Sequence, residues 1–341
     1  MNTFLGNQYS TRYVRLRPNV LVVQTAEKLA LIGDLAWVYP DPPDELGGVV
    51  ELMQAPAGVT LDVIAALVGQ EDASELCGVL YEHGFLQIGN APFTSGSESP
   101  CRDYFETALD SAQPGLAACS FVLVGCGGIG CEVARHLTAS GAGKITLLDF
   151  DNVTLGNLNR QYLFTLKDIG KPKVDVARAA LLEAAQGTEI LAVTARIQTV
   201  DDLEALGLEP ATAVLCCADT PRDIIGNVVH RYARSHGSWF GICGVGVLSG
   251  FWGPILSPDS VTIYQDVLTL QGEHDLLPAA TEVRASFGPT NSLIAAAFTR
   301  DVVHALLGDR PSSLDHRVDL DFRSFQSRRT PWEGETAAAP G

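Results

Sequence analysis

The segment Val122-Leu-Val-Gly-Cys-Gly-Gly-Ile-Gly130, followed by Leu147-Leu-Asp-Phe-Asp151, decides the fold of the central part of this chain. The apolar residues at its start predict a buried strand, and the glycine-rich run predicts a tight turn into a helix. Glycine lets the backbone approach a phosphate, and the N–H groups at such a helix start bind anions. The segment therefore predicts an α/β fold with a Rossmann-like doubly wound sheet and a nucleotide site. The glycines expected at that site are Gly125, Gly127, Gly128 and Gly130.

Polar residues after the second strand indicate what the nucleotide undergoes. Asp149 stands 19 residues after Gly130, at a strand end where a carboxylate can hold ribose hydroxyls. Arg160 and Lys173 follow it, although a dehydrogenase has no evident need for cations there. Attack on the α-phosphate of ATP gathers negative charge on the phosphorus and the departing pyrophosphate, which such cations stabilise. We therefore predict ATP chemistry, and a nicotinamide-dependent oxidoreductase is the weaker alternative.

A further acidic residue, Asp219, follows the apolar strand Ala213–Cys217. Ligands bind at the carboxyl ends of parallel strands, and carboxylate oxygens suit Mg²⁺. We predict that Asp219 binds Mg²⁺, with capping of the next helix as the alternative. We also expect Asp151 among the residues that bind the nucleotide, with support of Asp149 or a loop contact as open alternatives.

Five motifs in order, GCGGIG, LLDFD, NLNRQ, IGKPKVDVAR and CADTPRD, span residues 121–220 and resemble the ThiF/MoeB superfamily, relatives of the ubiquitin-activating enzymes. Weaker similarity extends to about residue 308. The resemblance implies an adenylyltransferase that uses ATP and Mg²⁺ to activate a carboxylate. It implies that Asp149 binds ribose, that Arg160 and Lys173 bind the phosphates and that Asp219 holds Mg²⁺. It also makes Asn157 and Gln161 polar loop residues of the site.

The composition restricts the partners and the compartment. With 40 acidic and 23 basic residues the net charge is −17, which argues against nucleic acid or an anionic membrane as the main partner. We do not expect a secretory signal at the start, and the uncharged run 235–257 carries too many glycines for a membrane helix. We predict that this run forms strands of a buried sheet. We therefore expect a cytoplasmic protein.

The eight cysteines include no C-x-x-C pair, so disulfides are not expected. Many relatives carry a structural zinc on two such pairs. The first location here is Ile263-Tyr-Gln-Asp266, and the segment from Arg329 onward has no cysteine. We predict no zinc site.

The first hundred residues predict a separate small domain. Residues 14–23 and 29–39 read as β segments, 51–53 as part of a further strand, 60–67 and 72–83 as helices, and 85–88 as a terminal strand. This order suggests a winged-helix α+β fold. Four acidic residues in the helical part would repel DNA, so we do not expect DNA binding.

The same segment resembles the leader-peptide recognition domains of ribosomally made peptide natural products, in which a peptide adds as a strand to a sheet edge. Its phrase Val14-Arg-Leu-Arg-Pro-Asn-Val20 and its element order carry that resemblance. A structural or dimerising extension is the alternative. Together, the two halves resemble the microcin C-type peptide-adenylating enzymes. The domains we expect are a winged-helix peptide-recognition domain at 1–90, a linker and lead-in helix at 91–118, an ATP-binding adenylation domain at 119–330, and a flexible tail at 331–341.

The sequence thus predicts a homodimeric adenylyltransferase that acts on a carboxyl or carboxamide group of a precursor peptide, with a second modifying enzyme as a possible partner. Two alternatives stay open. One is an enzyme that adenylates the C-terminal glycine of a ubiquitin-like sulfur-carrier protein. The other is a scaffold that binds the leader peptide and has an idle nucleotide site.

Overall fold

The computed structural model describes residues 12–25, 27–93, 100–109, 115–185, 187–222, 224–264 and 285–332. The chain divides into two compact units, Met1–Gln113 and Pro114–Gly341. Each unit has a hydrophobic core of its own. Parts of the expected linker, 94–99 and 110–114, lie outside the described residues, as do residues 333–341 of the expected tail.

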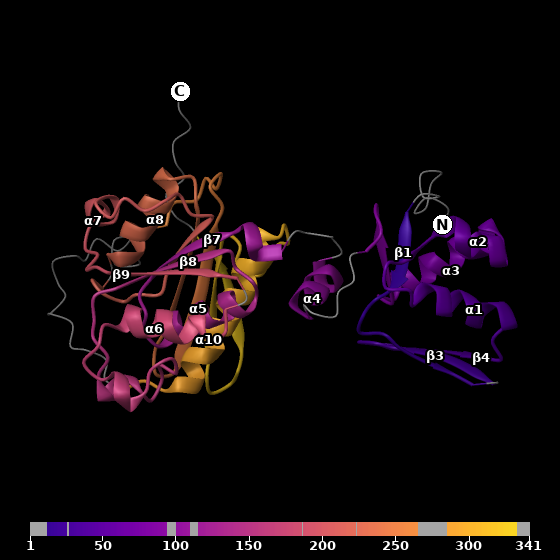
Figure 1. The fold of residues 1–341 in the computed structure, drawn as a ribbon, viewed down its shortest axis with the longest axis horizontal. Helices are drawn as coiled ribbons and strands as arrows, with labels where there is room; N and C mark the ends of the chain where they lie inside the picture. The colour runs from indigo at the N-terminus through magenta and orange to yellow at the C-terminus, as the bar shows by residue number, and fades with distance from the viewer. Residues whose placement is uncertain are drawn as a thin grey trace, which may run out of the picture. The chain divides into compact units, whose positions relative to one another are not determined.

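The larger unit is built on a sheet with the strand order β14-β13-β12-β11-β10-β7-β8-β9 (Figure 1). Its parallel part consists of β7 (Ser120–Val124), β8 (Lys144–Asp149), β9 (Glu189–Thr194), β10 (Ala213–Cys216) and β11 (Trp239–Val245). The antiparallel part consists of β12 (Ser249–Leu256), β13 (His316–Asp321) and β14 (Ser327–Pro331). Strands β11 and β12 occupy the uncharged run 235–257, which confirms its prediction as sheet. No helix in the described ranges is long and apolar enough to cross a membrane.

Helices cover both faces of this sheet. On one face, visible below the strands in Figure 1, lie α5 (Gly128–Ala139), α6 (Lys173–Leu182) and α10 (Gly288–Leu306). On the other lie α7 (Val200–Glu204) and α8 (Ile225–Ser235), and α8 packs on the apolar side chains of β7, β10 and β11. The doubly wound α/β architecture is therefore confirmed.

The order of the parallel strands reverses beside β7. The chain runs from β7 through α5 to β8 and then outward to β9, whereas β10 pairs with the opposite side of β7. The loops that leave β7 and β10 therefore diverge to opposite faces and open a crevice beyond the carboxyl ends of the strands.

The smaller unit contains two three-stranded sheets and three helices. One sheet has the order β5-β1-β6, from Val59–Thr60, Tyr13–Leu16 and Leu86–Gly89, and the other has the order β2-β3-β4, from Leu21–Gln24, Lys28–Ile32 and Ala36–Pro40. The helices are α1 (Asp44–Met53), α2 (Leu61–Val68) and α3 (Gln70–Glu82). Helices α2 and α3 begin and end within about two residues of their predicted bounds, and the element order agrees with the winged-helix expectation. A further helix, α4 (Pro100–Leu109), lies in the segment predicted as linker and lead-in helix.

One predicted element is wrong. Residues Glu51–Met53, expected in a strand, form the last turn of α1. The helix begins directly after Pro43, and its apolar side chains recur with helical spacing: Leu46, Val49, Val50 and Met53. The adjacent glycines Gly47 and Gly48 obscure this pattern because glycine disfavours a helix interior. Burial of Val49, Val50 and Met53 in the core outweighs that preference.

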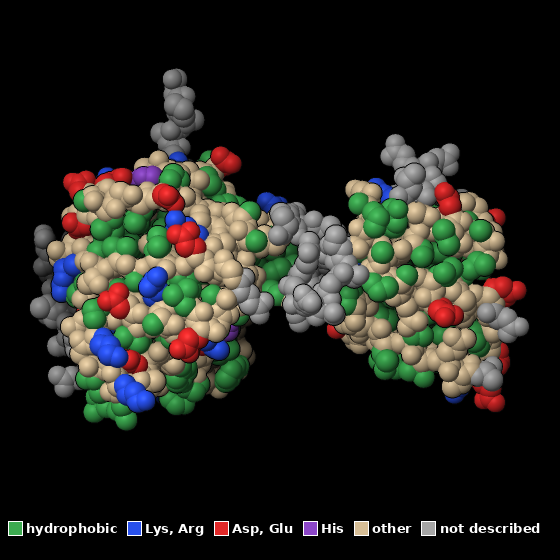
Figure 2. All heavy atoms as spheres, in the orientation of Figure 1, with side chains coloured by type: hydrophobic (Ala, Val, Ile, Leu, Met, Phe, Trp, Pro, Cys, Tyr) green, Lys and Arg blue, Asp and Glu red, His purple; other side chains and the backbone are tan. Residues whose placement is uncertain are grey.

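The surface of the smaller unit is not basic. Figure 2 shows acidic side chains scattered over its visible face and few basic ones. The four acidic residues of α3 are exposed, namely Glu71, Asp72, Glu75 and Glu82. A DNA phosphate backbone would be repelled by such a helix.

Candidate nucleotide-binding site

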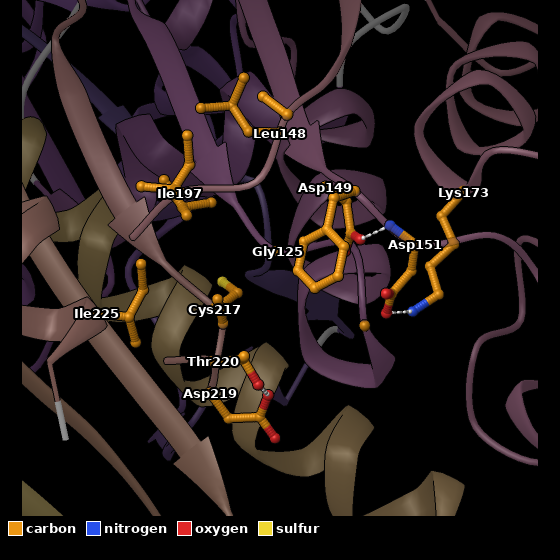
Figure 3. A pocket seen from close by; sticks show the side chains of 15 residues that line it. Gly125, Leu148, Asp149, Asp151, Lys173, Ile197, Cys217, Asp219, Thr220 and Ile225 are labelled. Carbon is orange, nitrogen blue, oxygen red and sulfur yellow. Dashed lines mark hydrogen bonds and ion pairs between the residues drawn. The ribbon is translucent and has the colours of Figure 1, made fainter. Parts of the chain in front are cut away.

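A pocket of about 550 Å³, including its open mouth, lies at the carboxyl ends of the parallel strands (Figure 3). The lining residues come from the ends of β7 and β8, from the loops after β7, β8, β9 and β10, and from the first residues of α6 and α8. Among the predicted site residues it brings together Gly125, Gly127, Asp149, Asp151, Lys173 and Asp219.

Asp149 lies at the end of β8, and both of its carboxylate oxygens accept backbone hydrogen bonds. The N–H of Cys126 donates to Oδ2 at 2.6 Å, and the N–H of Asp151 donates to Oδ1 at 2.8 Å. These charge-assisted bonds tie the glycine turn to β8 and fix the direction of the carboxylate. Further lone pairs on both oxygens stay available for ribose hydroxyls.

Lys173 and Asp151 form an ion pair in the pocket wall, which Figure 3 shows as a dashed line. Lys173 is the first residue of α6, and its Nζ lies 2.7 Å from Oδ2 of Asp151. The lysine side chain is only 7% exposed, whereas that of Asp151 is 47% exposed. The backbone N–H of Lys173 also donates to the carbonyl of Asp151 at 2.9 Å. Asp151 thus contacts Asp149 through its backbone N–H and Lys173 through its carboxylate.

Asp219 projects from the loop after β10 and is exposed. The Thr220 hydroxyl donates to its Oδ1 at 3.2 Å, and Figure 3 shows the two side chains together in the pocket wall. Mg²⁺ commonly takes one or two protein carboxylates and completes its shell with phosphate oxygens and water. The carboxylate of Asp219 fits that pattern.

The described residues contain no group of three or more His, Cys, Asp or Glu side chains that could hold a metal ion. Residues 265 and 266, from the first expected zinc location, lie outside the described ranges. The absence of zinc stays a prediction.

Arg160 does not line the pocket but lies beside the first turn of α5. Its Nη1 donates to the carbonyl of Gly156 at 2.8 Å and to Oδ1 of Asn159 at 3.0 Å. A Cβ placed on Gly128 would lie 3.2 Å from the Arg160 Cγ. The guanidinium must therefore turn from its present partners to reach a phosphate at the glycine turn.

Asn157 and Gln161 shape the same loop and do not line the pocket. Asn157 accepts the N–H of Thr154 through Oδ1 at 2.8 Å. Gln161 is buried, and its Oε1 has no hydrogen-bond partner among the described residues. The loop is anchored to the start of α10, because Nδ2 of Asn159 donates to the carbonyl of Ser286 at 2.9 Å.

The four glycines of the turn differ in what they allow. Gly125 has φ of +101°, and a Cβ there would meet the backbone of Ala218. A Cβ on Gly130 would collide with the carbonyl of Gly125, and one on Gly128 would collide with the amide of Asn291. Gly127 alone among the four has open space around such a Cβ. The turn therefore keeps an unobstructed approach to the backbone at Gly127, which fits a nucleotide phosphate.

Several residues that line the pocket were not predicted from the sequence. Leu148, Ile197 and Ile225 form an apolar side of the pocket, opposite the polar side with Asp151 and Lys173 (Figure 3). Such a division suits a nucleotide, whose base is apolar on its faces and whose phosphates are charged. The ring of Phe150 also lines the pocket, and the Arg196 guanidinium stacks on it at 3.8 Å. No motif pointed to Arg196, which lies 46 residues further along the chain.

The profile of the ThiF family matches residues 102–337 of this sequence. The chain belongs to the ThiF family. Among curated proteins, this ThiF-family chain is 31% identical over 153 residues to the NEDD8-activating enzyme E1 catalytic subunit of Arabidopsis thaliana, which covers 43% of this chain and 31% of that protein. It is 40% identical over 108 residues to the molybdopterin-synthase adenylyltransferase of Escherichia coli K12, which covers 31% of this chain and 42% of that protein. The chain thus spans less than half the length of these relatives.

Solved structures resemble this ThiF-family chain over nearly its whole length. Escherichia coli MccB with ATP superposes with a TM-score of 0.77 at 20% identity, covering 96% of this chain and 98% of MccB. PaaA superposes with a TM-score of 0.66 at 23% identity, covering 92% of this chain and 98% of PaaA. At these identities the likeness establishes a shared fold.

Proposed function

We propose that this protein uses Mg·ATP to adenylate a carboxyl or carboxamide-derived group on a ribosomally made precursor peptide. The observation that carries the proposal is the convergence of Asp149, Lys173 and Asp219 around the glycine turn, in a chain of the ThiF family. Their chemistry matches the three parts of Mg·ATP: ribose, phosphates and metal ion. Relatives in the family include adenylyltransferases, which supports the same reaction class.

In the proposed reaction, an oxygen of the substrate attacks the α-phosphorus of ATP and pyrophosphate leaves. Asp149 holds the ribose through the lone pairs that its backbone donors leave unused. Lys173 stabilises the charge that grows on the phosphates, and Arg160 joins it from the neighbouring loop. The backbone N–H groups at the start of α5 contribute a further fixed positive potential. Asp219 would hold Mg²⁺, which would neutralise part of the charge on the phosphates.

The smaller unit supplies the proposed peptide site. Strands β2 and β4 each pair only with β3 among the described strands, so each leaves one edge for an added strand. A peptide that adds to such an edge gains backbone hydrogen bonds, and side-chain contacts select its sequence. Exposed apolar side chains on these strands, Leu21, Val23 and Val38 among them, offer such contacts. Structures of the fold relative MccB with ATP and with N-formylated MccA support the combination of nucleotide and second component.

The proposal includes a cytoplasmic homodimer that receives its leader peptide at the smaller unit and can hand the product to a second modifying enzyme. Pyrophosphate exchange tests the central step. Purified protein incubated with ATP, Mg²⁺, labelled pyrophosphate and an intact precursor peptide should form labelled ATP. The variant Arg160→Ala should lose that exchange by about 100-fold or more, since removal of one such charge stabiliser costs this much. Lys167→Ala removes an exposed cation from the same loop and should retain it.

Other outcomes would replace the proposal. Exchange only with a carrier protein that ends in Gly-Gly would assign the chain to sulfur-carrier activation, as its similarity to the molybdopterin-synthase adenylyltransferase allows. Tight leader binding without exchange for any peptide would leave a scaffold with an idle nucleotide site. If the precursor peptide supports exchange, the intact mass of that peptide after incubation identifies the product.

A further inference from the structure

Two thiols meet beside the nucleotide pocket. Cys217 follows β10 and lines the pocket, where Figure 3 shows its sulfur at the inner wall. Its Sγ lies 4.0 Å from Sγ of Cys243, which is buried in the neighbouring strand β11. The proposed reaction uses neither of these sulfurs.

The strand register permits a bond between them. Cys216 lies opposite Ile242 in the parallel pair β10–β11, so Cys217 and Cys243 come next along the same pair. Neighbouring strands are about 4.8 Å apart, and Cα atoms joined by a disulfide are about 4.4–6.8 Å apart. The sulfurs can therefore close to bonding distance by small side-chain rotations, without a change in the pairing of the sheet.

The two thiols differ in their exposure to solvent. Cys217 is partly exposed in the pocket and accessible to a small oxidant. Cys243 is buried, and that burial raises the pKa of its thiol well above the usual value. Burial keeps Cys243 away from an oxidant in solution, and its Sγ lies only 4.0 Å from that of Cys217, so the geometry leaves it the second step, in which a neighbouring thiol captures an oxidised sulfur.

We propose that Cys217 and Cys243 form a reversible disulfide when a peroxide enters the pocket, and that this bond weakens nucleotide binding. In the first step the Cys217 thiol reacts with the peroxide to give a sulfenic acid and water. In the second, the Cys243 thiol attacks that sulfur, forming the S–S bond and releasing a second water. A dithiol reductant reverses the change and leaves both thiols free.

The effect on the nucleotide follows from what Cys217 contacts. A Cβ on Gly130 would lie 3.4 Å from the Cys217 Cβ, and a Cβ on Gly125 would lie 2.9 Å from the Cys217 carbonyl carbon. The backbone at Cys217 thus packs against the glycine turn and leads directly to Asp219. Rotation of Sγ toward β11 withdraws the thiol from the pocket wall beside this junction and so changes the surface that a nucleotide would meet there. We expect the dissociation constant for Mg·ATP to rise about tenfold in the oxidised protein.

The test compares reduced and peroxide-treated full-length protein. Intact mass should show the loss of two hydrogen atoms, and peptide mapping with fragmentation should place the bond between Cys217 and Cys243. Bound Mg·ATP should slow the oxidation. Cys243→Ala should keep its reduced ATP affinity and lose the reductant-reversible change, whereas Cys131→Ala, with a buried thiol of α5 outside the pair, should oxidise as wild type does.

A bond mapped from Cys217 to Cys126, or an unchanged dissociation constant in protein that carries the 217–243 bond, would overturn the inference. Peptide mapping of wild-type protein needs no variant, so poor folding of Cys243→Ala leaves the test intact. The effect on ATP rests on the proposed function. If reduced wild-type protein binds no ATP, that function and the nucleotide effect both fail, while the map still decides whether the disulfide forms.

Discussion

Lys173 is held in the nucleotide pocket by a carboxylate far more exposed than itself. An ammonium group with 7% of its side chain exposed needs a partner, because an uncompensated buried charge is costly. Asp151 provides that partner and remains half in solvent. When a phosphate takes over the ammonium group, water can solvate the carboxylate, so the exchange of partners leaves neither charge stranded.

This arrangement predicts the effect of Lys173→Met. Methionine keeps the apolar stem, and Asp151 can relax into solvent, so the unfolding free energy should change by about 1 kcal/mol or less. Pyrophosphate exchange should fall by about 100-fold or more, since the fixed charge on the phosphates is lost. The control Lys167→Met alters an exposed lysine of the preceding loop and should leave both quantities unchanged. Near-normal exchange in Lys173→Met would remove Lys173 from the proposed reaction.

At the scale of single residues, the sequence predicted which residues lie at the pocket better than it predicted which side chains contact each other. Strand ends placed Asp149 and Asp219 at the pocket because a parallel sheet brings its carboxyl ends together. The pairing of Lys173 with Asp151 crosses 22 residues, and the stacking of Arg196 on Phe150 depends on how two loops pack. Neither follows from local patterns. The motif around Arg160 predicts a phosphate contact. In the structure its guanidinium donates to residues of its own loop, beside the pocket.

In the turn into α5, one glycine is needed for packing of the fold and another leaves space for a ligand. Gly130→Ala would place a methyl group against the carbonyl of Gly125 and should destabilise the larger unit by about 3 kcal/mol. Gly127→Ala meets no neighbouring atom, so the fold should tolerate it, but its methyl group would stand where a phosphate approaches. We expect near wild-type unfolding and at least tenfold weaker ATP binding for Gly127→Ala. Urea denaturation and calorimetric titration measure the two effects, and equal unfolding of both variants would contradict this division.

Helix α8 contains a residue that should make stability depend on pH. His230 packs edge to face on Phe240 at 5.1 Å, and its Nδ1 has no partner among the described residues. Burial, reinforced by Arg234, lowers the pKa of His230 to about 4. The folded protein thus resists protonation that the unfolded chain accepts below about 6.5. The contribution of neutral His230 to the free energy of unfolding is complete above pH 6.5 and is lost as the pH falls toward 4.

The expected loss from His230 is about 2 kcal/mol of unfolding free energy between pH 7.5 and pH 5. His230→Leu removes the titrating ring and should flatten the pH profile by that amount. Urea denaturation of both proteins at the two pH values tests this. Parallel pH profiles for wild type and variant would show that His230 does not carry the effect.

Helices were predicted correctly where the apolar spacing and the glycines that end a helix indicated the same bounds. Helices α2 and α3 have clear apolar spacing and end at Gly69 and Gly84. Helix α1 was missed because Gly47 and Gly48 lie inside it, and its formation depends on burial of one face in a core assembled from distant segments. Tertiary packing of that kind leaves a weak local signal.

On the scale of the whole molecule, separate cores in the two units imply separate functions. The apolar residues of the ThiF-type sheet form one cluster with α8, and the smaller unit forms a cluster of its own. A chain that begins at Pro114 should therefore fold and bind Mg·ATP with unchanged affinity. Its peptide-dependent exchange should fall by about 100-fold, because binding energy from the leader no longer contributes. Calorimetric titration and exchange measure the two quantities, and full peptide-dependent exchange by the shortened chain would place leader recognition in the larger unit.

The charge of the pocket has a consequence for supply of the nucleotide. Its described lining combines the carboxylates of Asp149, Asp151 and Asp219 with the ammonium of Lys173, in a protein of net charge −17. Under the proposed function, these carboxylates would disfavour a bare polyphosphate, and the divalent ion would enter together with its nucleotide. Turnover would then follow the cell's complexed nucleotide pool rather than its total. A cell short of magnesium would silence this protein while its ATP remained abundant.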